Sequence, residues 1–278
     1  MNRIDSAFQR IKERGEKALI AYIMAGDPTL EETEAYVLAL AQAGADIVEL
    51  GVPFSDPIAD GPVIQQAGER ALRSGTSLKK TLAAVRSLRT KTQIPLVLMA
   101  YYNSVFRYGE AAFCRDAVAA GVDGLIVPDM PPDEAGTIHP LAAAAGLDVI
   151  FLLAPTSTAK REAAVARLSR GFIYYVSLTG ITGAKLTDKV DVEKKVREIR
   201  RYTRTPVAVG FGIATPEDAR EVARIADGVI VGSALVKIIA GGVIVGSALV
   251  KLITESGASV TDRLSSFTRS LKGATQPA

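Results

Sequence analysis

Eight short runs rich in Val, Ile and Leu, separated by longer segments of helical period, are the feature that most restricts the fold of this chain. Each run is apolar on both faces, which is typical of strands in a parallel sheet that is covered on both sides. Many of the intervening segments begin at Thr, Ser or Asp and end at Gly, the usual helix caps. The runs lie at residues 18–26, 46–52, 95–103, 124–130, 148–155, 172–178, 206–212 and 227–233.

Eight strand–helix units in one chain predict an α/β fold of the (β/α)8, or TIM-barrel, type. The alternative is an open, doubly wound sheet, but no Gly-x-Gly-x-x-Gly motif follows the first strand, which disfavours its dinucleotide-binding version. We therefore expect residues 1–278 to form a single TIM-barrel domain, with an extra helix in the charged N-terminal segment 1–17.

A tandem repeat interrupts this regular plan near the C-terminus. Residues 228–241 and 242–255 both begin GVIVGSALVK, and without the 14 repeated residues the chain would have 264. That length is close to the roughly 250 residues of a typical barrel, so the repeat is interpreted as an addition to a complete barrel. Either copy could form strand eight. The first is favoured because its connection to the preceding helix is unchanged. A ninth strand is not expected, since it would change the closure of the barrel.

Composition excludes several classes of function. A net charge of +3 and a pI of about 8.9 are too mild to favour nucleic acid as a partner. The single cysteine, Cys114, rules out an internal disulfide and fits a cytoplasmic location. The single histidine, His139, leaves no histidine-based metal cluster. Residues 228–250 carry only Lys237 as a charge and could imitate a transmembrane helix, but two tandem buried strands explain that length better.

The strongest candidate for chemistry is Glu49, near the end of the second strand. Because strand side chains alternate between the barrel interior and the helix layer, Val48 and Leu50 should face the helices and Glu49 should point inward. Catalytic groups of barrels lie at this end of the strands. An inward carboxyl group has a raised pKa suited to acid–base catalysis, unless it is a salt-bridged core residue. Asp60, just before Gly-Pro, is either a second such group or a helix cap.

Glycine-rich turns late in the chain indicate a phosphate site. Gly210-Phe211-Gly212 follows strand seven, and Gly232-Ser233 follows strand eight, where Ser233 is expected to cap a short helix. The Gly/Thr-rich loop 178–189 after strand six suits a mobile lid.

Other barrel chemistries fit less well. A Schiff-base aldolase needs a lysine at a strand end, and the eight runs carry none, whereas a zinc aldolase normally needs several histidines. Aromatic residues near strand ends suggest an aromatic substrate, although core packing is the alternative for each. They are Tyr22, Tyr101, Tyr102, Tyr174, Tyr175 and Phe211.

With these residues in view, the chain resembles the alpha-subunit family of tryptophan synthase. The most specific match is ELGVPFSDPIADGP at 49–62. Further matches are Gly-Asp-Pro at 26–28, TGITG at 179–183, and the GFGI and VGSALVK segments. The resemblance implies a lyase of tryptophan biosynthesis that splits indole-3-glycerol phosphate into indole and glyceraldehyde 3-phosphate by a retro-aldol reaction.

The resemblance also implies roles for individual residues. Glu49 would be the general acid/base, Asp60 would handle the indole N–H proton, and Tyr174 would lie beside them. The indole slot would be lined by Tyr22, Met99, Tyr101 and Phe211. The phosphate would be held by Gly183, Gly212, Gly232 and Ser233, with Gly246 and Ser247 as the spare copy of the last turn.

No cofactor or metal is expected in this chain, and neither nucleic acid nor membrane is expected as a partner. The resemblance implies an alpha2beta2 assembly with a beta subunit that uses pyridoxal phosphate and receives indole directly, coupled through loops 53–60 and 179–189. Two alternatives stay open. One is an alpha-type partner whose own catalysis is impaired by the repeat. The other is a different phosphate-binding barrel enzyme of aromatic amino-acid biosynthesis.

Overall fold

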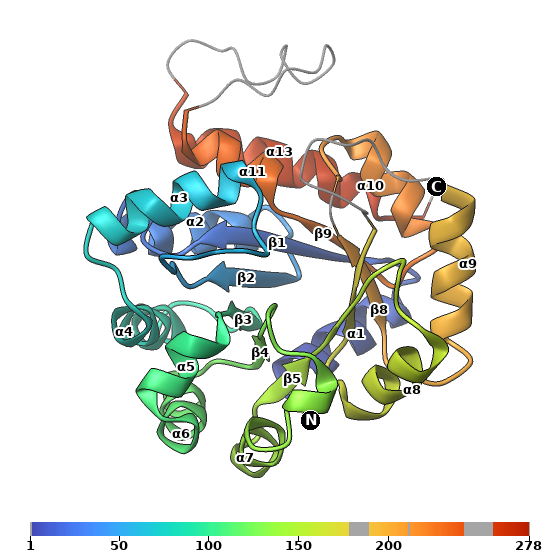
Figure 1. Cartoon of the computed structure of the whole chain (residues 1–278). Helices are drawn as coiled ribbons and strands as arrows, with labels where there is room; N and C mark the ends of the chain where they lie inside the picture. Colours follow the sequence, from blue (N-terminus) through green and yellow to red (C-terminus); the bar gives the residue numbers. More distant parts are fainter. Residues whose placement is uncertain (1, 178–188, 211, 242–257, 278) are drawn as a thin grey trace.

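The computed structural model describes residues 2–177, 189–210, 212–241 and 258–277, and its parallel strands form a barrel with helices around the outside (Figure 1). The strands are β1 (Ala18–Met24), β2 (Ile47–Gly51), β3 (Leu96–Met99), β4 (Gly124–Ile126), β5 (Asp148–Ile150), β6 (Leu152–Leu153), β7 (Ile173–Val176), β8 (Val207–Gly210) and β9 (Gly228–Val231). The helices are α1 (Arg3–Glu13), α2 (Leu30–Gln42), α3 (Pro62–Arg73), α4 (Leu78–Arg89), α5 (Tyr102–Tyr108), α6 (Glu110–Ala120), the 3-10 turn η1 (Pro132–Glu134), α7 (Ile138–Ala145), α8 (Ala159–Leu168), α9 (Lys189–Ile199), α10 (Pro216–Ala223), α11 (Ser233–Ile239) and α13 (Val260–Ala274).

The strand order around the barrel is β5-β4-β3-β2-β1-β9-β8-β7-β6. The first and last members of this order, β5 and β6, are consecutive in the chain and separated only by Phe151. They are two halves of the predicted fifth strand, of which β5 pairs with β4 and β6 pairs with β7. The nine segments in the described residues therefore correspond to the eight strands expected from the sequence, and the TIM-barrel prediction is confirmed.

The first copy of the repeat supplies the strand that lies between β8 and β1. Gly228 lies opposite both Ala208 of β8 and Ala18 of β1, so β9 is hydrogen-bonded on both sides. A Cβ atom at Gly228 would lie 3.2 Å from the Cβ atoms of those two alanines, a close packing that suits glycine. This pairing agrees with the preference for the first copy. The second copy, with Gly246 and Ser247, lies outside the described residues.

Alternation along the strands divides the core into two layers. Val48 and Leu50 of β2 are buried in the large layer between the strands and the outer helices, whereas Ile47 is buried in a separate cluster inside the barrel. The same rule separates Tyr174, in the inner cluster, from its neighbour Tyr175, in the outer layer. The inward direction expected for Glu49 and Tyr174 follows from this register.

The N-terminal helix α1 closes the bottom of the barrel. Its Ile4, Phe8 and Ile11 belong to the inner cluster, so the apolar face of the helix is buried against the strands. The Asn2 side chain caps α1 by accepting hydrogen bonds from the amides of Ile4 and Asp5. The extra N-terminal helix predicted from the sequence is thereby confirmed.

The C-terminal helix α13 is tied to the same end of the barrel. The Nζ of Lys272 lies 3.0 Å from Glu16 and 2.9 Å from Asp46, and the amide of Lys17 donates to the carbonyl of Thr275. The helix that follows the repeat is therefore anchored independently of it. Of the helices that the structure describes, none is long and apolar enough to cross a membrane.

Candidate active site

Glu49 lies at the centre of the candidate site. In the strand register, Glu49 of β2 pairs with Tyr22 of β1 and with Val97 of β3. Glu49 is only 1% exposed. Within the described part of the chain neither of its carboxylate oxygens has a hydrogen-bond partner, so the alternative of a salt-bridged core residue is disfavoured. Burial, and to a smaller extent the charge of Asp60, raise the pKa of Glu49 to about 8. The group is therefore protonated at neutral pH and poised to donate or accept a proton.

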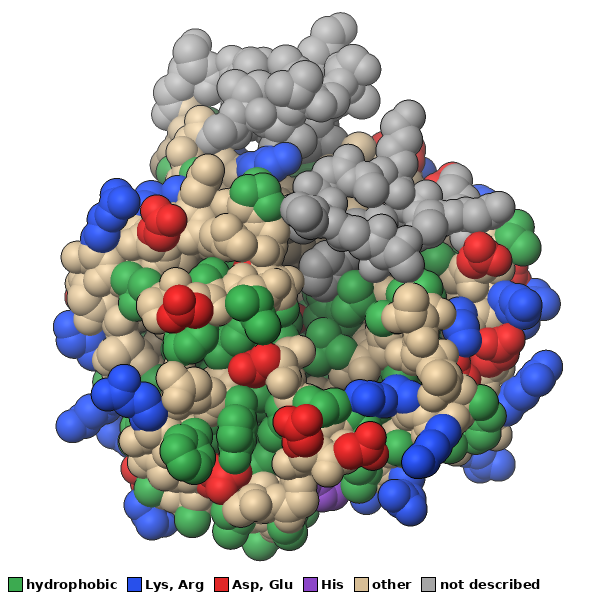
Figure 2. Space-filling view, viewed as in Figure 1, with side chains coloured by type: hydrophobic (Ala, Val, Ile, Leu, Met, Phe, Trp, Pro, Cys, Tyr) green, Lys and Arg blue, Asp and Glu red, His purple; other side chains and the backbone are tan. Residues whose placement is uncertain are grey.

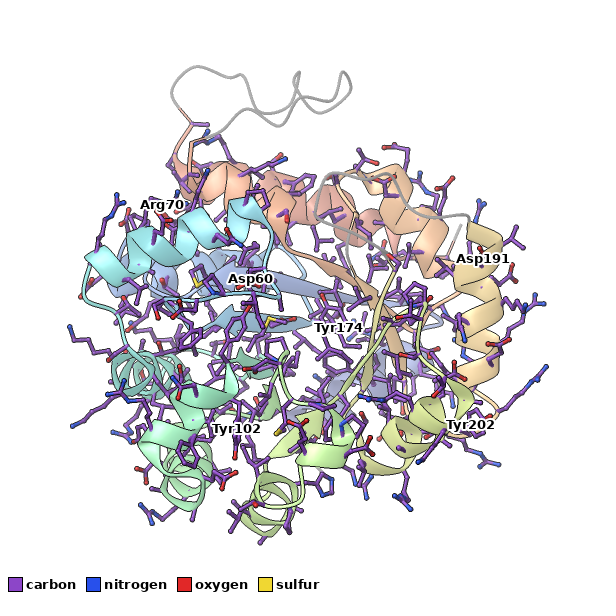
Figure 3. All side chains as sticks on the ribbon, viewed as in Figure 1. Asp60, Arg70, Tyr102, Tyr174, Asp191 and Tyr202 are labelled. Atoms are coloured by element: carbon purple, nitrogen blue, oxygen red, sulfur yellow. The ribbon has the colours of Figure 1, made fainter. Side chains whose placement is uncertain are left out.

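Asp60 is held in the loop between β2 and α3 by Tyr101. The Tyr101 hydroxyl accepts a hydrogen bond at 2.9 Å from the amide of Ala59, the residue that precedes Asp60. The Phe54 ring stacks on Tyr101 with 5.0 Å between ring centroids. Burial raises the pKa of Asp60 to about 6, and the nearby Tyr101 hydroxyl opposes that rise. Figure 3 shows Asp60 toward the middle of this face of the barrel.

The alternative reading of Asp60 as a helix cap is not supported. The N-cap of α3 is Gly61, Pro62 is its first residue, and no side chain caps it. Proline at this position needs no amide partner, so the helix starts without help from the Asp60 carboxylate.

Two inward tyrosines complete the neighbourhood of the carboxyl groups. The pKa of Tyr22 and that of Tyr174 are raised well above the ordinary value, first by burial and then by the charges of Asp60 and Glu49. Tyr22 pairs with Glu49 in the register of β1 and β2, and Tyr174 belongs to the inner cluster. In Figure 3 Tyr174 also lies toward the middle of the barrel.

Glycines at two strand ends make room for these rings, a role that sequence reasoning missed. A Cβ atom at Gly51 would lie 2.1 Å from the Tyr22 hydroxyl oxygen, and one at Gly210 would lie 2.6 Å from that of Tyr174. Neither contact is sterically possible, so any larger residue would displace the ring. The sequence contained a signal for this role. In each case an inward-facing glycine ends one strand, and the neighbouring strand carries an inward-facing tyrosine.

The other aromatic and apolar candidates separate into two groups. Met99, at the end of β3, is partly buried and packs against the inner cluster and against the cluster that contains Tyr22. Tyr175 faces the outer helix layer, and Tyr102 lies on α5, where its hydroxyl donates to Glu110 at 3.0 Å. The suggestion that Tyr102 and Tyr175 contact an aromatic substrate is therefore wrong, because one lies on an outer helix and the register turns the other outward.

The predicted phosphate turn lies where β9 meets α11. Gly232 is the N-cap of α11, and Ser233 is its first helical residue. The expectation that Ser233 caps the helix is therefore wrong, because the cap is Gly232, one residue earlier. No side chain caps α11. The first amides of a helix have no acceptor within the helix, so they can bind an anion. Gly212, with a φ of +78°, is exposed just after the adjacent β8.

Several predicted site residues cannot be placed. Gly183 and Phe211, and the turn of the second copy at Gly246 and Ser247, lie outside the described residues. No group of three or more His, Cys, Asp or Glu side chains that could hold a metal ion occurs among the residues the structure describes. On the barrel face seen in Figure 2, hydrophobic side chains gather around a hollow at the centre.

The family model for the tryptophan synthase alpha chain matches residues 8–241. The chain belongs to the tryptophan synthase alpha-chain family. The match ends at the last residue of the first repeat copy, in agreement with the position of β9 between β8 and β1.

Relatives in this family cover nearly the whole chain. The tryptophan synthase alpha chain of Citrifermentans bemidjiense is 52% identical over 272 residues, which are 98% of this chain and 97% of that protein. The alpha chain of Geobacter sulfurreducens is 54% identical over 238 residues, 86% and 90% of the two chains. Tryptophan synthase subunit alpha of Legionella pneumophila is similar in structure, with a TM-score of 0.88, 37% identity, and 99% and 98% of the two chains covered.

Proposed function

We propose that this member of the alpha-chain family is a lyase that cleaves indole-3-glycerol phosphate into indole and glyceraldehyde 3-phosphate. The observation that carries the proposal is the buried, unpartnered carboxyl group of Glu49 beside Asp60, with pKa values raised to about 8 and about 6. At a pH between these values Glu49 holds a proton and Asp60 does not. One acid and one base are then available in the same apolar chamber.

The proposed reaction uses the two carboxyl groups in turn. Glu49 donates its proton to C3 of the indole ring, while Asp60 accepts the proton of the ring N–H. The Glu49 carboxylate then takes the proton of the glycerol hydroxyl adjacent to the ring. As the aldehyde forms, the carbon–carbon bond breaks, its electron pair returns to the ring, and Asp60 gives the N–H proton back. Both carboxyl groups end in their starting states.

The remaining side chains are proposed to bind the substrate. The rings of Tyr22, Tyr101 and Phe211, together with Met99, would enclose the indole, and Tyr174 would lie beside the reacting carbon. Backbone amides at Gly183, Gly212, Gly232 and Ser233 would bind the phosphate. The start of α11 supports this, because its free amides and dipole attract an anion. No step requires a metal or a cofactor in this chain.

A pyridoxal-phosphate-dependent beta subunit is the proposed partner, in an alpha2beta2 assembly to which loops 53–60 and 179–189 contribute. A solved structure similar to this chain is that of tryptophan synthase from Mycobacterium tuberculosis, with a TM-score of 0.88 and 38% identity over 100% of this chain and 99% of that one. Ile58 and Phe106 are 84% and 64% exposed, and their contact with a partner would remove apolar surface from water. We further propose a cytoplasmic location, since the single cysteine permits no internal disulfide.

Release of indole, with and without a beta subunit, tests this function. We expect slow release by the full chain alone, acceleration by a beta subunit, and a loss of at least about 10²- to 10⁴-fold in Glu49→Gln, because the acid/base group is gone. The fold of that variant is checked by circular dichroism. Activation of a beta subunit without indole release would identify a non-catalytic partner, and neither activity would indicate another phosphate-binding barrel enzyme.

A further inference from the structure

The Gly26-Asp27-Pro28 motif after β1 has no part in the proposed chemistry, yet it contains a buried acid. Asp27 is 1% exposed and forms a bidentate ion pair with Arg70 of α3, in which the guanidinium Nε and one terminal nitrogen each lie 2.7 Å from a carboxylate oxygen. Bidentate pairs of this kind fix relative orientation as well as distance. The loop after β1 is thus joined rigidly to the last turn of α3.

Neighbouring contacts reinforce the same joint. The hydroxyl of Ser74, at the C-cap of α3, donates to the Gly26 carbonyl at 3.1 Å. Gly26 has a φ of +83°, and a Cβ atom there would lie 1.9 Å from the Thr76 hydroxyl oxygen. The backbone of the motif therefore approaches the end of α3 as closely as only glycine allows.

Helix α3 links this joint to the catalytic loop. It begins at Pro62, two residues after Asp60, so any shift of the helix moves that end of the loop. Its Ile64, Ala67 and Ala71 pack in a cluster with Met24 of β1 and Val236 of α11. On its other side the loop is held by the hydrogen bond from the Ala59 amide to the Tyr101 hydroxyl, at 2.9 Å. In Figure 3 Arg70 lies on α3 away from the centre of the barrel, whereas Asp60 lies toward it, so Arg70 does not act on the substrate directly.

We propose that Asp27 and Arg70 are positioning residues, which hold α3 so that Asp60 stays at the distance from Glu49 that the reaction needs. This inference rests on the proposed roles of Asp60 and Glu49. The pair itself takes no part in proton transfer.

The test compares variants of the full chain by indole release. Asp27→Asn combined with Arg70→Met removes both charges together, so no unpaired charge is left buried. We expect kcat to fall by about 10- to 100-fold, the size of effect produced by a misplacement of about 1 Å, with a smaller change in KM. Arg70→Lys should recover part of the rate, since lysine keeps the charge but not the bidentate geometry.

Arg73→Met is the matched control. Arg73 lies on the same last turn of α3, is 79% exposed, and pairs only loosely with Glu69 at 3.5 Å. Its kcat should be unchanged. If the double variant is folded by circular dichroism and keeps a normal kcat, the pair serves stability alone and the proposal is overturned.

A double-mutant cycle with Asp60→Asn shows through which residue the pair acts. If the pair works through Asp60, its loss should add little to the defect of Asp60→Asn. Fully additive losses would mean that the pair acts elsewhere and would overturn the inference while leaving the proposed function intact. If Asp60→Asn alone kept a normal kcat, both the proposed function and this inference would fail.

Discussion

At the scale of single residues, burial sets the protonation states of the two carboxyl groups of the site. Glu49 is surrounded by strands, and its pKa of about 8 reflects burial first and the charge of Asp60 second. Asp60 is less completely buried and lies near the Tyr101 hydroxyl, which favours its charged form, so its pKa rises only to about 6. The same kind of group therefore has two different protonation states near neutral pH.

The first prediction concerns the pH dependence of the activity. If Asp60 must be ionised and Glu49 protonated in the free enzyme, kcat/KM should rise as the pH increases through about 6 and fall as it increases through about 8. Asp60→Asn should lower the rate and abolish the acidic limb. A profile that is flat between pH 5 and 9, measured by indole release, would contradict this assignment of the two groups.

The second prediction concerns stability. The folded state raises the pKa of Glu49 from 4.5 to about 8, so the folded chain binds this proton more tightly than the unfolded chain. The contribution is fully present below pH 4.5 and is lost as the pH rises to about 8. Glu49→Gln avoids that loss. It should match the wild type near pH 5 and exceed it at pH 9 by a few kcal/mol, roughly 1.4 kcal/mol for each pKa unit of the shift.

Urea unfolding of both proteins at pH 5 and pH 9 measures this difference. Equal stabilities at both pH values would show that the Glu49 carboxyl group is hydrated or paired in the folded chain. Asp133→Asn is a suitable control, because Asp133 is 73% exposed and its substitution should not produce the same pH dependence.

At the scale of elements, glycines at strand ends make room for the aromatic rings near the two carboxyl groups. Gly51 at the end of β2 and Gly210 at the end of β8 admit the Tyr22 and Tyr174 rings above them. Tyr22 also approaches the proposed phosphate turn, since a Cβ atom at Gly232 would lie 3.4 Å from its ring. The Tyr22 ring thus lies next to the start of α11, and in the strand register Tyr22 pairs with Glu49.

The third prediction separates the two copies of the turn. Gly232→Asp adds a side chain and a negative charge at the start of α11, so it should raise KM steeply by opposing phosphate. Gly246→Asp makes the same change in the second copy and should have little effect, since the first copy is paired into the barrel. The KM values of the two variants, measured by indole release, show which copy binds the phosphate. If Gly246→Asp is the damaging variant, the second copy forms the working phosphate turn.

At the scale of the whole molecule, the elements before and after the second repeat copy, α11 and α13, are anchored separately. Helix α11 continues directly from β9 and packs against β1 and α3, while α13 packs against α2, α10 and α11. Lys272 ties α13 to Glu16 and Asp46 at the bottom of the barrel. The positions of both helices are therefore set by contacts within the described part of the chain.

The fourth prediction is that removing the second copy preserves the protein. Deletion of residues 242–255 should leave kcat unchanged and the thermal midpoint equal or higher, because about a dozen apolar residues that the barrel does not need are removed. Circular dichroism and indole release check this. Deletion of residues 228–241 is the matched comparison, since it also leaves one copy. If only that deletion folds, the second copy makes contacts that the first cannot replace.

The sequence by itself determined the barrel and the inward direction of Glu49, because both follow from local periodicity: strands apolar on both faces, helices with caps, and alternation along each strand. It also limited the chemistry to carboxyl groups, since a chain with one histidine and no lysine in its eight strand runs has few other choices. Only the tertiary structure decided that Tyr101 bonds to the loop at Ala59 and that Asp60 does not cap α3. It also decided that the N-cap of α11 is Gly232 and not Ser233, and that Tyr102 lies outside the site. These outcomes depend on neighbours distant in the chain. The repeat shows the same limit most clearly, because two nearly identical segments have the same local preferences, and pairing with β1 and β8 assigns the strand to the first of them.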